Sequence, residues 1–225
     1  MITTGYPYSS SVKTEVFDLH SNTICQDLKD FPSKLVGAVG GTVNGVPTVC
    51  GGSSGGFQDK CYQLIDNDWK ELTTMAEKRG DASSIMHDDK MHVFGGYDGG
   101  RILDTSEVVS VNSSYPGPKL PTGVWFHTIT GLNKTTSILA GGRTDYSFAS
   151  AKTWYYDHEE QIFSKGPALQ QGRRLHGSAT VEDVVAKEKI AVVAGGNDDG
   201  WNELDSTELL ANNQWIPGKI QFQPH

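Results

Sequence analysis

The chain has 225 residues, of which 36% are aliphatic, aromatic, methionine or cysteine, so it carries enough apolar surface for a packed interior and does not resemble a disordered chain. Its formal net charge of −8 at pH 7 argues against a nucleic-acid partner, because phosphate binding requires a basic face. The longest apolar runs are far shorter than the roughly 20 residues of a membrane helix, so a membrane is not expected as a partner either.

A short apolar run that ends in two glycines occurs four times. In the clearest copy, His92-Val93-Phe94 precedes the pair, which is typical of a buried strand whose end turns tightly or lies against another backbone. The first glycines of successive pairs are 44, 46 and 54 residues apart, within the range of β-propeller repeats. The pairs are Gly51-Gly52, Gly95-Gly96, Gly141-Gly142 and Gly195-Gly196.

Aligned on these glycines, each repeat contains four short strand-like segments, named a, b, c and d in chain order. In the best copy, turn residues separate segments at 79–86, 90–94, 105–111 and around Tyr115. Segment c often reads Ser or Thr, then Glu, then two apolar residues, as in Ser106-Glu107-Val108-Val109. The pattern predicts about nineteen strands, because the first unit lacks its segment a. The units span approximately 1–32, 33–76, 77–121, 122–169 and 170–225, and segment a is expected at 35–41, 79–86, 125–129 and 174–179.

The glycine pairs, the Glu-apolar segment c, the aromatic residue after the c–d turn and the start of segment a together resemble the kelch repeat. The start of segment a is basic or bears histidine, at Arg79, His127 and Arg174 with His176. The resemblance covers nearly the whole chain. It implies a single all-β domain, a kelch-type β-propeller of about five four-stranded antiparallel blades, open or incomplete, with segment a nearest the axis. The departures are Val109 and Leu210, where the pattern prefers Tyr, and Cys25, where it prefers Trp.

By this alignment the chain starts within segment b of its first unit and stops where another segment a would begin. We expect either an excerpt of a longer protein or an open or unusually small ring. Met1–Gly5 has neither a basic nor a long apolar region, which favours the cytoplasm by a small margin. Secretion stays open, since a targeting segment could lie upstream, and the sequons at Asn112 and Asn133 would matter only there.

Three cysteines are too few for a disulfide scaffold and form no zinc pattern. Cys50 and Cys61 flank one glycine pair on neighbouring predicted strands, so they could approach to bonding distance. The two interpretations are a disulfide and a pair of buried free thiols.

In an antiparallel blade of this strand order, the b–c and d–a loops emerge on the same face. The b–c loops are long and mix aromatic with charged residues, the combination enriched at binding hot spots on a rigid scaffold. The alternative is that these aromatic side chains pack over neighbouring loops and shield the sheet edges. The candidate partner-binding residues are Phe57, Tyr97, Asp98, Arg101, Arg143, Asp145, Tyr146, Phe148, Asp198, Asp199 and Trp201.

Catalytic chemistry finds less support. His127 and His176 both fall in segment a, but a metal needs three or four converging ligands, and the second and third units offer Val36 and Asp81 instead. The run Asp198-Asp199-Gly200 could suggest calcium, although Asp-Gly is ordinary turn chemistry. We therefore expect no catalytic residue, no metal and no cofactor.

The leading hypothesis is a non-catalytic scaffold or adaptor that binds another protein through the b–c loop face. One alternative is a kelch-type enzyme, galactose oxidase-like or a lyase, that uses the axial cavity. Galactose oxidase chemistry uses a Tyr–Cys crosslink, and the cysteines of this chain are expected in outer or mid-blade strands, away from the axis. The other alternative is an extracellular adhesion or matrix module. Fold resemblance alone does not identify a partner.

Overall fold

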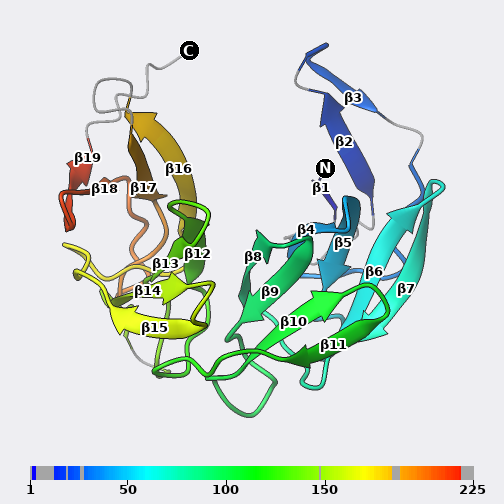
Figure 1. Cartoon of the computed structure of the whole chain (residues 1–225), viewed down its shortest axis with the longest axis horizontal. Helices are drawn as coiled ribbons and strands as arrows, with labels where there is room; N and C mark the ends of the chain where they lie inside the picture. Colours follow the sequence, from blue (N-terminus) through cyan, green and yellow to red (C-terminus); the bar gives the residue numbers. More distant parts are fainter. Residues whose placement is uncertain are drawn as a thin grey trace. The chain divides into compact units, whose positions relative to one another are not determined.

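The computed structural model describes residues 2–3, 13–18, 20–25, 28–146, 148–183 and 188–218. These residues form nineteen β-strands and no helix (Figure 1), which confirms the predicted all-β class. No helix among them has the length and apolar character of a membrane span. The strands are β1 Ile2–Thr3, β2 Thr14–Asp18, β3 Thr23–Cys25, β4 Val39–Val43, β5 Val46–Cys50, β6 Lys60–Ile65, β7 Asp68–Thr74, β8 Ser83–His87, β9 Lys90–Phe94, β10 Ser106–Ser110, β11 Ser113–Pro116, β12 Thr128–Gly131, β13 Thr136–Ala140, β14 Thr153–Asp157, β15 Ile162–Lys165, β16 Gly177–Asp183, β17 Glu188–Ala194, β18 Thr207–Ala211 and β19 Gln214–Gly218.

Consecutive strands pair into five antiparallel sheets. Four sheets have four strands, β4–β7, β8–β11, β12–β15 and β16–β19, while the first has the three strands β1–β3. The chain divides into two compact units: unit 1, Met1–Gly117, holds the first three sheets in sequence, and unit 2, Pro118–His225, holds the other two. This set of sheets fits the predicted incomplete kelch-type propeller.

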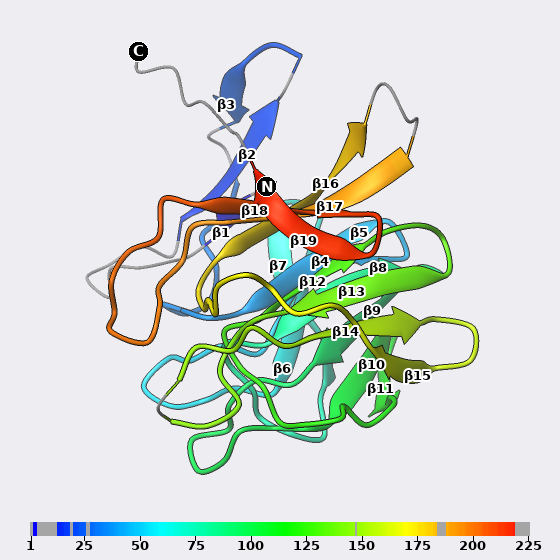
Figure 2. The same ribbon diagram turned by 90° about the vertical axis from the view of Figure 1, so that its left-hand side faces the viewer.

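Two-residue turns close five of the hairpins, and four of these turns share one conformation. Asn44-Gly45 and Asp88-Asp89 join segments a and b, and Asp66-Asn67 and Asn212-Asn213 join segments c and d. Both residues of each turn have positive φ, as type I′ turns require and as Asn, Asp and Gly tolerate. The longest hairpin is different: β16 and β17 pair over seven residues, and Figure 2 shows their far end extending past β18 and β19.

The predicted start of segment a was wrong in all four complete sheets. The strands begin at Val39, Ser83, Thr128 and Gly177, about three to four residues later than expected. Two residues before each strand lies a residue in the left-handed region: Gly37, Asp81, Phe126 and Leu175, with φ between 54° and 63°. A left-handed residue interrupts an extended strand, so the residues before it form a separate lead-in.

The glycine pairs have the same conformation in all four complete sheets. Every glycine of the four pairs has positive φ. At Gly142 a Cβ atom would stand 2.6 Å from the carbonyl oxygen of Trp125, so the close backbone approach and the left-handed φ both require glycine. The Gly142 N–H also donates to the Arg173 carbonyl (2.8 Å), and Gly52 does the same to Arg79 (2.8 Å). Each of these two pairs therefore ties its sheet to the lead-in of the next.

The core lies between the facing sheets of each unit. In unit 1 it joins Val43 of β4 to Met91 and Val93 of β9, and in unit 2 it joins Ile138 of β13 to Trp215 of β19. The first strands of neighbouring sheets also lie side by side, β4 beside β8 and β12 beside β16. Face-to-face packing of successive sheets is how propeller blades bury apolar surface.

Candidate functional site

The b–c loops are built on one plan. The residue directly after each glycine pair forms two isolated bridges, one with the lead-in and one with a later loop residue, as Tyr97 does with Gly80 and Ile102. Backbone hydrogen bonds run both ways between Tyr97 and Gly80 (2.9 and 3.0 Å). The equivalent residues are Ser53, Tyr97, Arg143 and Asn197. Every loop is thus anchored on the end of its sheet, the arrangement that commonly presents side chains for recognition.

In unit 1 the predicted aromatic residues pack against each other. The rings of Phe57 and Tyr97 meet edge to face, with centroids 5.3 Å apart and an interplanar angle of 89°. Both residues are half-buried. The Phe57 ring also fills the space beside Gly80, where a Cβ would lie 2.8 Å from it. This is the inter-loop packing that the sequence left open as the alternative.

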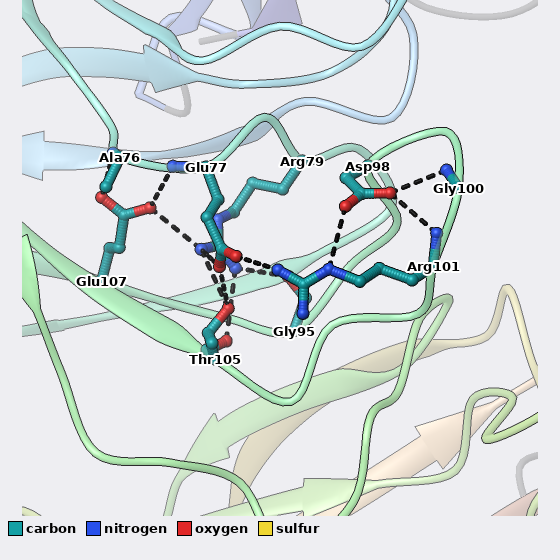
Figure 3. Close-up of polar contacts among 9 residues, drawn as sticks. All are labelled: Ala76, Glu77, Arg79, Gly95, Asp98, Gly100, Arg101, Thr105 and Glu107. Atoms are coloured by element: carbon teal, nitrogen blue, oxygen red, sulfur yellow. Dashed lines mark hydrogen bonds and ion pairs between the residues drawn. The ribbon is translucent and has the colours of Figure 1, made fainter.

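The charged residues of the same loops in unit 1 are also engaged with one another. Arg101 forms ion pairs with Glu77 and, at 3.2 Å, with Asp98. Asp98 Oδ1 accepts hydrogen bonds from the backbone N–H groups of Gly100 (2.7 Å) and Arg101 (2.8 Å) (Figure 3). Burial raises the pKa of Asp98, but these backbone bonds and the Arg101 charge together outweigh it and lower the pKa.

A buried ion pair ties the lead-in to segment c in two sheets. Arg79 donates from Nη1 to the carbonyl of Gly95 (2.7 Å) and from Nη2 to Glu107 (2.9 Å), and Figure 3 shows this network. Glu107 in turn accepts from the backbone N–H groups of Ala76 (2.7 Å) and Glu77 (3.0 Å). The Glu of segment c is therefore a structural residue: its carboxylate accepts the hydrogen bonds of backbone N–H groups just before the lead-in.

Unit 2 repeats this network one residue away from the position that the sequence alignment indicated. The structural counterpart of Arg79 is Arg173, which donates to Gly195 O (3.0 Å) and Glu208 (2.8 Å). The alignment of Arg79 with Arg174 was wrong, because two consecutive arginines left the register ambiguous. Arg174 instead occupies the place of Gly80, bridged to Asn197.

The aromatic residues of the unit 2 loops are exposed. The fractional exposures are 58% for Tyr146, 62% for Phe148 and 64% for Trp201. The two loops that carry them are joined, because Asp199 Oδ1 accepts a hydrogen bond from the backbone N–H of Ala149. Three large apolar side chains therefore lie in solvent on two connected loops, as residues at binding surfaces do.

Aspartates fix the backbone of these loops. Asp145 Oδ1 accepts from the Phe148 N–H (2.9 Å), and Asp198 Oδ1 accepts from the N–H groups of Gly200 (2.8 Å) and Asn202 (2.9 Å). The Asn202 side chain is the main reason that the pKa of Asp198 is lowered. These contacts are those of Asx turns. The described residues contain no group of three or more His, Cys, Asp or Glu side chains that could hold a metal.

Two arginines of unit 2 are buried beside indole rings. Arg143 is 8% exposed and lies over the Trp125 ring at 5.7 Å, while Arg174 is 2% exposed and lies over the Trp201 ring at 3.5 Å. Sequence reasoning selected Arg143 and Trp201 but missed Arg174 and Trp125 as parts of this arrangement. The doubled Arg173-Arg174 was the available signal, because one network per sheet needs only one arginine.

The two segment-a histidines are buried. His176 Nε2 lies 3.0 Å from Thr128 Oγ1, a hydrogen bond whose direction depends on the tautomer. Burial lowers the pKa of His127 to about 3, with His176 adding to the effect. Burial, and then the charge of Arg173, lowers the pKa of His176 to about 3 as well. Both are therefore neutral at pH 7 and pack inside unit 2.

Cys50 and Cys61 are bonded to each other. They lie opposite one another on β5 and β6, with Cα atoms 4.1 Å apart, and both are fully buried. The equivalent cross-strand pairs of unit 2 are Ala140–Thr153 and Ala194–Thr207. The disulfide thus replaces an ordinary small pair, and it engages two of the three cysteines of the chain, neither of which is then free to form a Tyr–Cys crosslink.

Comparison with known proteins supports the kelch resemblance. No family model matches the chain. The chain is 30% identical over 97 residues to Kelch-like protein 41b of Danio rerio, a match that covers 43% of this chain. It spans only about 15% of the length of that relative. Together with the four-stranded antiparallel sheets, this similarity points to a kelch-repeat protein, a class that commonly binds other proteins and is typically not enzymatic.

Proposed function

We propose that this chain is a non-catalytic protein-interaction module that binds a partner through the b–c loops of unit 2. The observation that carries the proposal is the set of three exposed aromatic side chains, Tyr146, Phe148 and Trp201. Aromatic residues on a rigid support lose little conformational freedom on binding and dominate interface energies. The hydrogen bond between Asp199 and Ala149 supports a contact surface formed by both loops.

The contribution of the unit 1 loops is smaller in this proposal. Phe57 and Tyr97 contact each other, and Arg101 already pairs with two carboxylates. A partner would have to break these contacts before gaining new ones, which reduces the net free energy of binding. We therefore assign the main contact to unit 2.

Affinity capture tests the proposal. The full chain is immobilised, and proteins captured from a cell extract are quantified by mass spectrometry. Replacing Tyr146, Phe148 and Trp201 with Ala is expected to abolish capture of the specific partners and to leave the circular dichroism unchanged. The matched control is Ile162→Ala, because Ile162 is 59% exposed on β15, outside the b–c loops. Undiminished capture by the triple variant would refute the proposal.

A second candidate is the same interaction role outside the cell. The Cys50–Cys61 disulfide favours it, because structural disulfides persist in oxidising compartments. Asn112 and Asn133 also lie exposed in turns, where a glycan would fit. Intact mass measurement of the protein from its native source, treated with an alkylating reagent without reduction, tests this candidate. The candidate predicts glycan at these positions and no alkylation of Cys50 or Cys61, and alkylation of these two cysteines would exclude it.

A further inference from the structure

Arg143 and Arg174 of unit 2 are buried without the partners that other buried arginines of this chain have. Arg79 and Arg173 each donate from both Nη atoms, to carbonyl oxygens and to a glutamate. Within the described residues all four arginines lack a hydrogen-bond partner at Nε, so what sets the other two apart is Nη1 of Arg174, which has no partner, and the missing ion pair at both Arg143 and Arg174. Neither forms an ion pair with any carboxylate within the described part of the chain.

The two arginines lie close together. The Gly142 N–H donates to Arg173 O (2.8 Å). Arg143 directly follows Gly142 and Arg174 directly follows Arg173, so this hydrogen bond brings the two arginines near each other. Burial lowers the pKa of Arg174, and the positive charge of Arg143 lowers it further. Two neighbouring buried cations without an ion-paired carboxylate are unfavourable. An anion supplied from outside the chain would relieve this cost.

The nearest carboxylates of the chain are committed elsewhere. Asp198 and Asp199 act on Arg174 electrostatically, but Asp199 accepts from the backbone of Ala149, and Asp198 accepts from Gly200 and Asn202. These contacts hold the loop in shape. A ligand anion would therefore not need to displace a carboxylate from Arg174.

Trp201 covers Arg174. Its ring lies 3.5 Å over the guanidinium, and it is 64% exposed while Arg174 is 2% exposed. One face of the indole therefore rests on the cation while most of the ring contacts solvent. Trp201 also has a φ of 61°, an uncommon conformation for a bulky residue. The cover is thus a surface residue on a loop, attached mainly by a cation–π contact.

We propose that Arg143 and Arg174 bind an acidic side chain of the protein partner, and that Trp201 moves off Arg174 to admit it and then contacts the partner. This deepens the proposed function and rests on it. The occupant is an Asp or Glu flanked by apolar residues, since Tyr146 and Phe148 lie exposed on the loop joined to that of Trp201. Planar guanidinium groups match a carboxylate in a forked geometry that an ammonium group cannot provide.

A labelled hexaglutamate peptide and its hexaglutamine counterpart are the probes. Binding to the purified full chain is measured by fluorescence anisotropy at low ionic strength, where charge interactions are least screened. Hexaglutamate should bind and hexaglutamine should not. Arg174→Gln and Arg143→Gln should each weaken hexaglutamate binding by roughly tenfold or more, the loss typical of a charge-assisted hydrogen bond. The control Lys134→Gln changes an exposed cation in the β12–β13 turn, at the opposite end of the sheet, and should change binding less than about twofold.

Trp201→Ala gives a second test that alters no buried residue. If Trp201 is the cover, its removal should strengthen hexaglutamate binding by about threefold or more, because the cation–π contact no longer has to be broken. The same variant should weaken capture of the partner. Equal hexaglutamate binding by wild type, Arg174→Gln and Trp201→Ala would overturn the inference, while loss of partner capture in the triple aromatic variant would still uphold the proposed function.

The last arm distinguishes the source of the anion. A peptide in which phosphoserine replaces the glutamates is titrated alongside hexaglutamate. Weaker or equal binding of the phosphoserine peptide supports a carboxylate ligand. Much tighter binding, reversed by Arg174→Gln, would overturn the carboxylate assignment in favour of a phosphorylated segment.

Discussion

The b–c loops of the two units share one backbone arrangement but differ in what their side chains contact. In unit 1, Phe57 packs on Tyr97, and Arg101 pairs with Glu77 and Asp98. In unit 2 the corresponding loops leave aromatic rings in solvent, and two buried arginines there, Arg143 and Arg174, form no ion pair with a carboxylate of the described residues. The difference shows that loop composition does not locate a binding surface. What distinguishes the two is whether the loop residues already satisfy one another.

A similar contrast exists within unit 1. The sheet β8–β11 is closed by the Arg79–Glu107 pair, whereas the sheet β4–β7 holds Leu35 and Tyr62 at the same positions, packed with Phe31 and Trp69. The polar network and the apolar cluster thus occur in sheets of the same topology. The polar and apolar networks are therefore alternative ways to join the lead-in to segment c.

The largest expected loss of stability comes from breaking the Arg79–Glu107 network. Glu107→Gln should lower the free energy of unfolding by up to about 3–5 kcal/mol, because it removes the buried carboxylate of the pair and leaves Arg79 only the half-buried Glu77, 3.3 Å from Nη2. Urea denaturation measures the change. Glu15→Gln is the control, since Glu15 holds the same register position on β2 but is exposed, and it should cost less than about 0.5 kcal/mol.

Replacing both partners sharpens this test. The double variant Arg79→Leu with Glu107→Tyr copies Leu35 and Tyr62, and it should be more stable than Glu107→Gln, because no buried charge is left alone. A double variant that is less stable than the single variant would show that the polar network and the apolar cluster are not interchangeable between the two sheets.

The disulfide allows an exchange between the units. Cys50→Ala with Cys61→Thr installs the small pair found at Ala140–Thr153 in unit 2. Because the bond closes a loop with a sequence separation of 11, its loss should destabilise unit 1 by about 2–3 kcal/mol. Hydrogen exchange of unit 1 strands under non-reducing conditions measures this, and protection equal to that of wild type would contradict the assigned bond.

As the pH falls from about 6 to 4, the buried titratable groups of the two units should change stability in opposite directions. The pKa of His127 and His176 is lowered from 6.5 to about 3, so the unfolded chain binds more protons between these values, and unit 2 loses stability as the pH falls through that window. The slope is up to ~1.4 kcal/mol per pH unit for each histidine. Burial raises the pKa of Asp81 in unit 1 from 3.8 to about 6. The folded state then binds more protons, so Asp81 adds stability to unit 1 as the pH falls from about 6 to 4.

Hydrogen exchange at about pH 6.5 and about pH 4.5, corrected for intrinsic rates, separates the two responses. The variant is His127→Ala with His176→Ala. Each histidine lies one residue before the first strand of its sheet, where unit 1 has Ala38 before β4 and Ala82 before β8. This variant should flatten the acid response of unit 2. If the double variant lost as much unit 2 stability at the lower pH as wild type does, the two histidines would not be the cause of the acid response.

Much of the fold could be predicted from local patterns. Apolar runs between turn residues located the b and c strands, and β9 has the predicted bounds. The lead-ins could not be predicted, because Phe126 and Leu175 adopt positive φ although nothing in their side chains favours it. Their conformation depends on the bridges between the lead-in and the b–c loop, which are contacts distant in sequence.

The site was less predictable than the fold. Sequence composition showed that Phe57 and Trp201 lie in equivalent loops, but not that one faces a neighbouring loop and the other faces solvent. It also could not show that Arg173 is part of a structural network while Arg174 is not, since the two are adjacent and identical in type. Burial and pairing decide these roles, and both depend on tertiary contacts.

Partner capture by two matched sets of loop variants tests the central claim most directly. One set is Tyr146→Ala, Phe148→Ala and Trp201→Ala in unit 2; the other is Phe57→Ala with Tyr97→Ala in unit 1. We predict that the unit 2 set abolishes capture with no loss of stability. The unit 1 set should lower stability by about 1–3 kcal/mol, while the folded protein still captures the partner. Loss of capture with the unit 1 set, and full capture with the unit 2 set, would contradict the account.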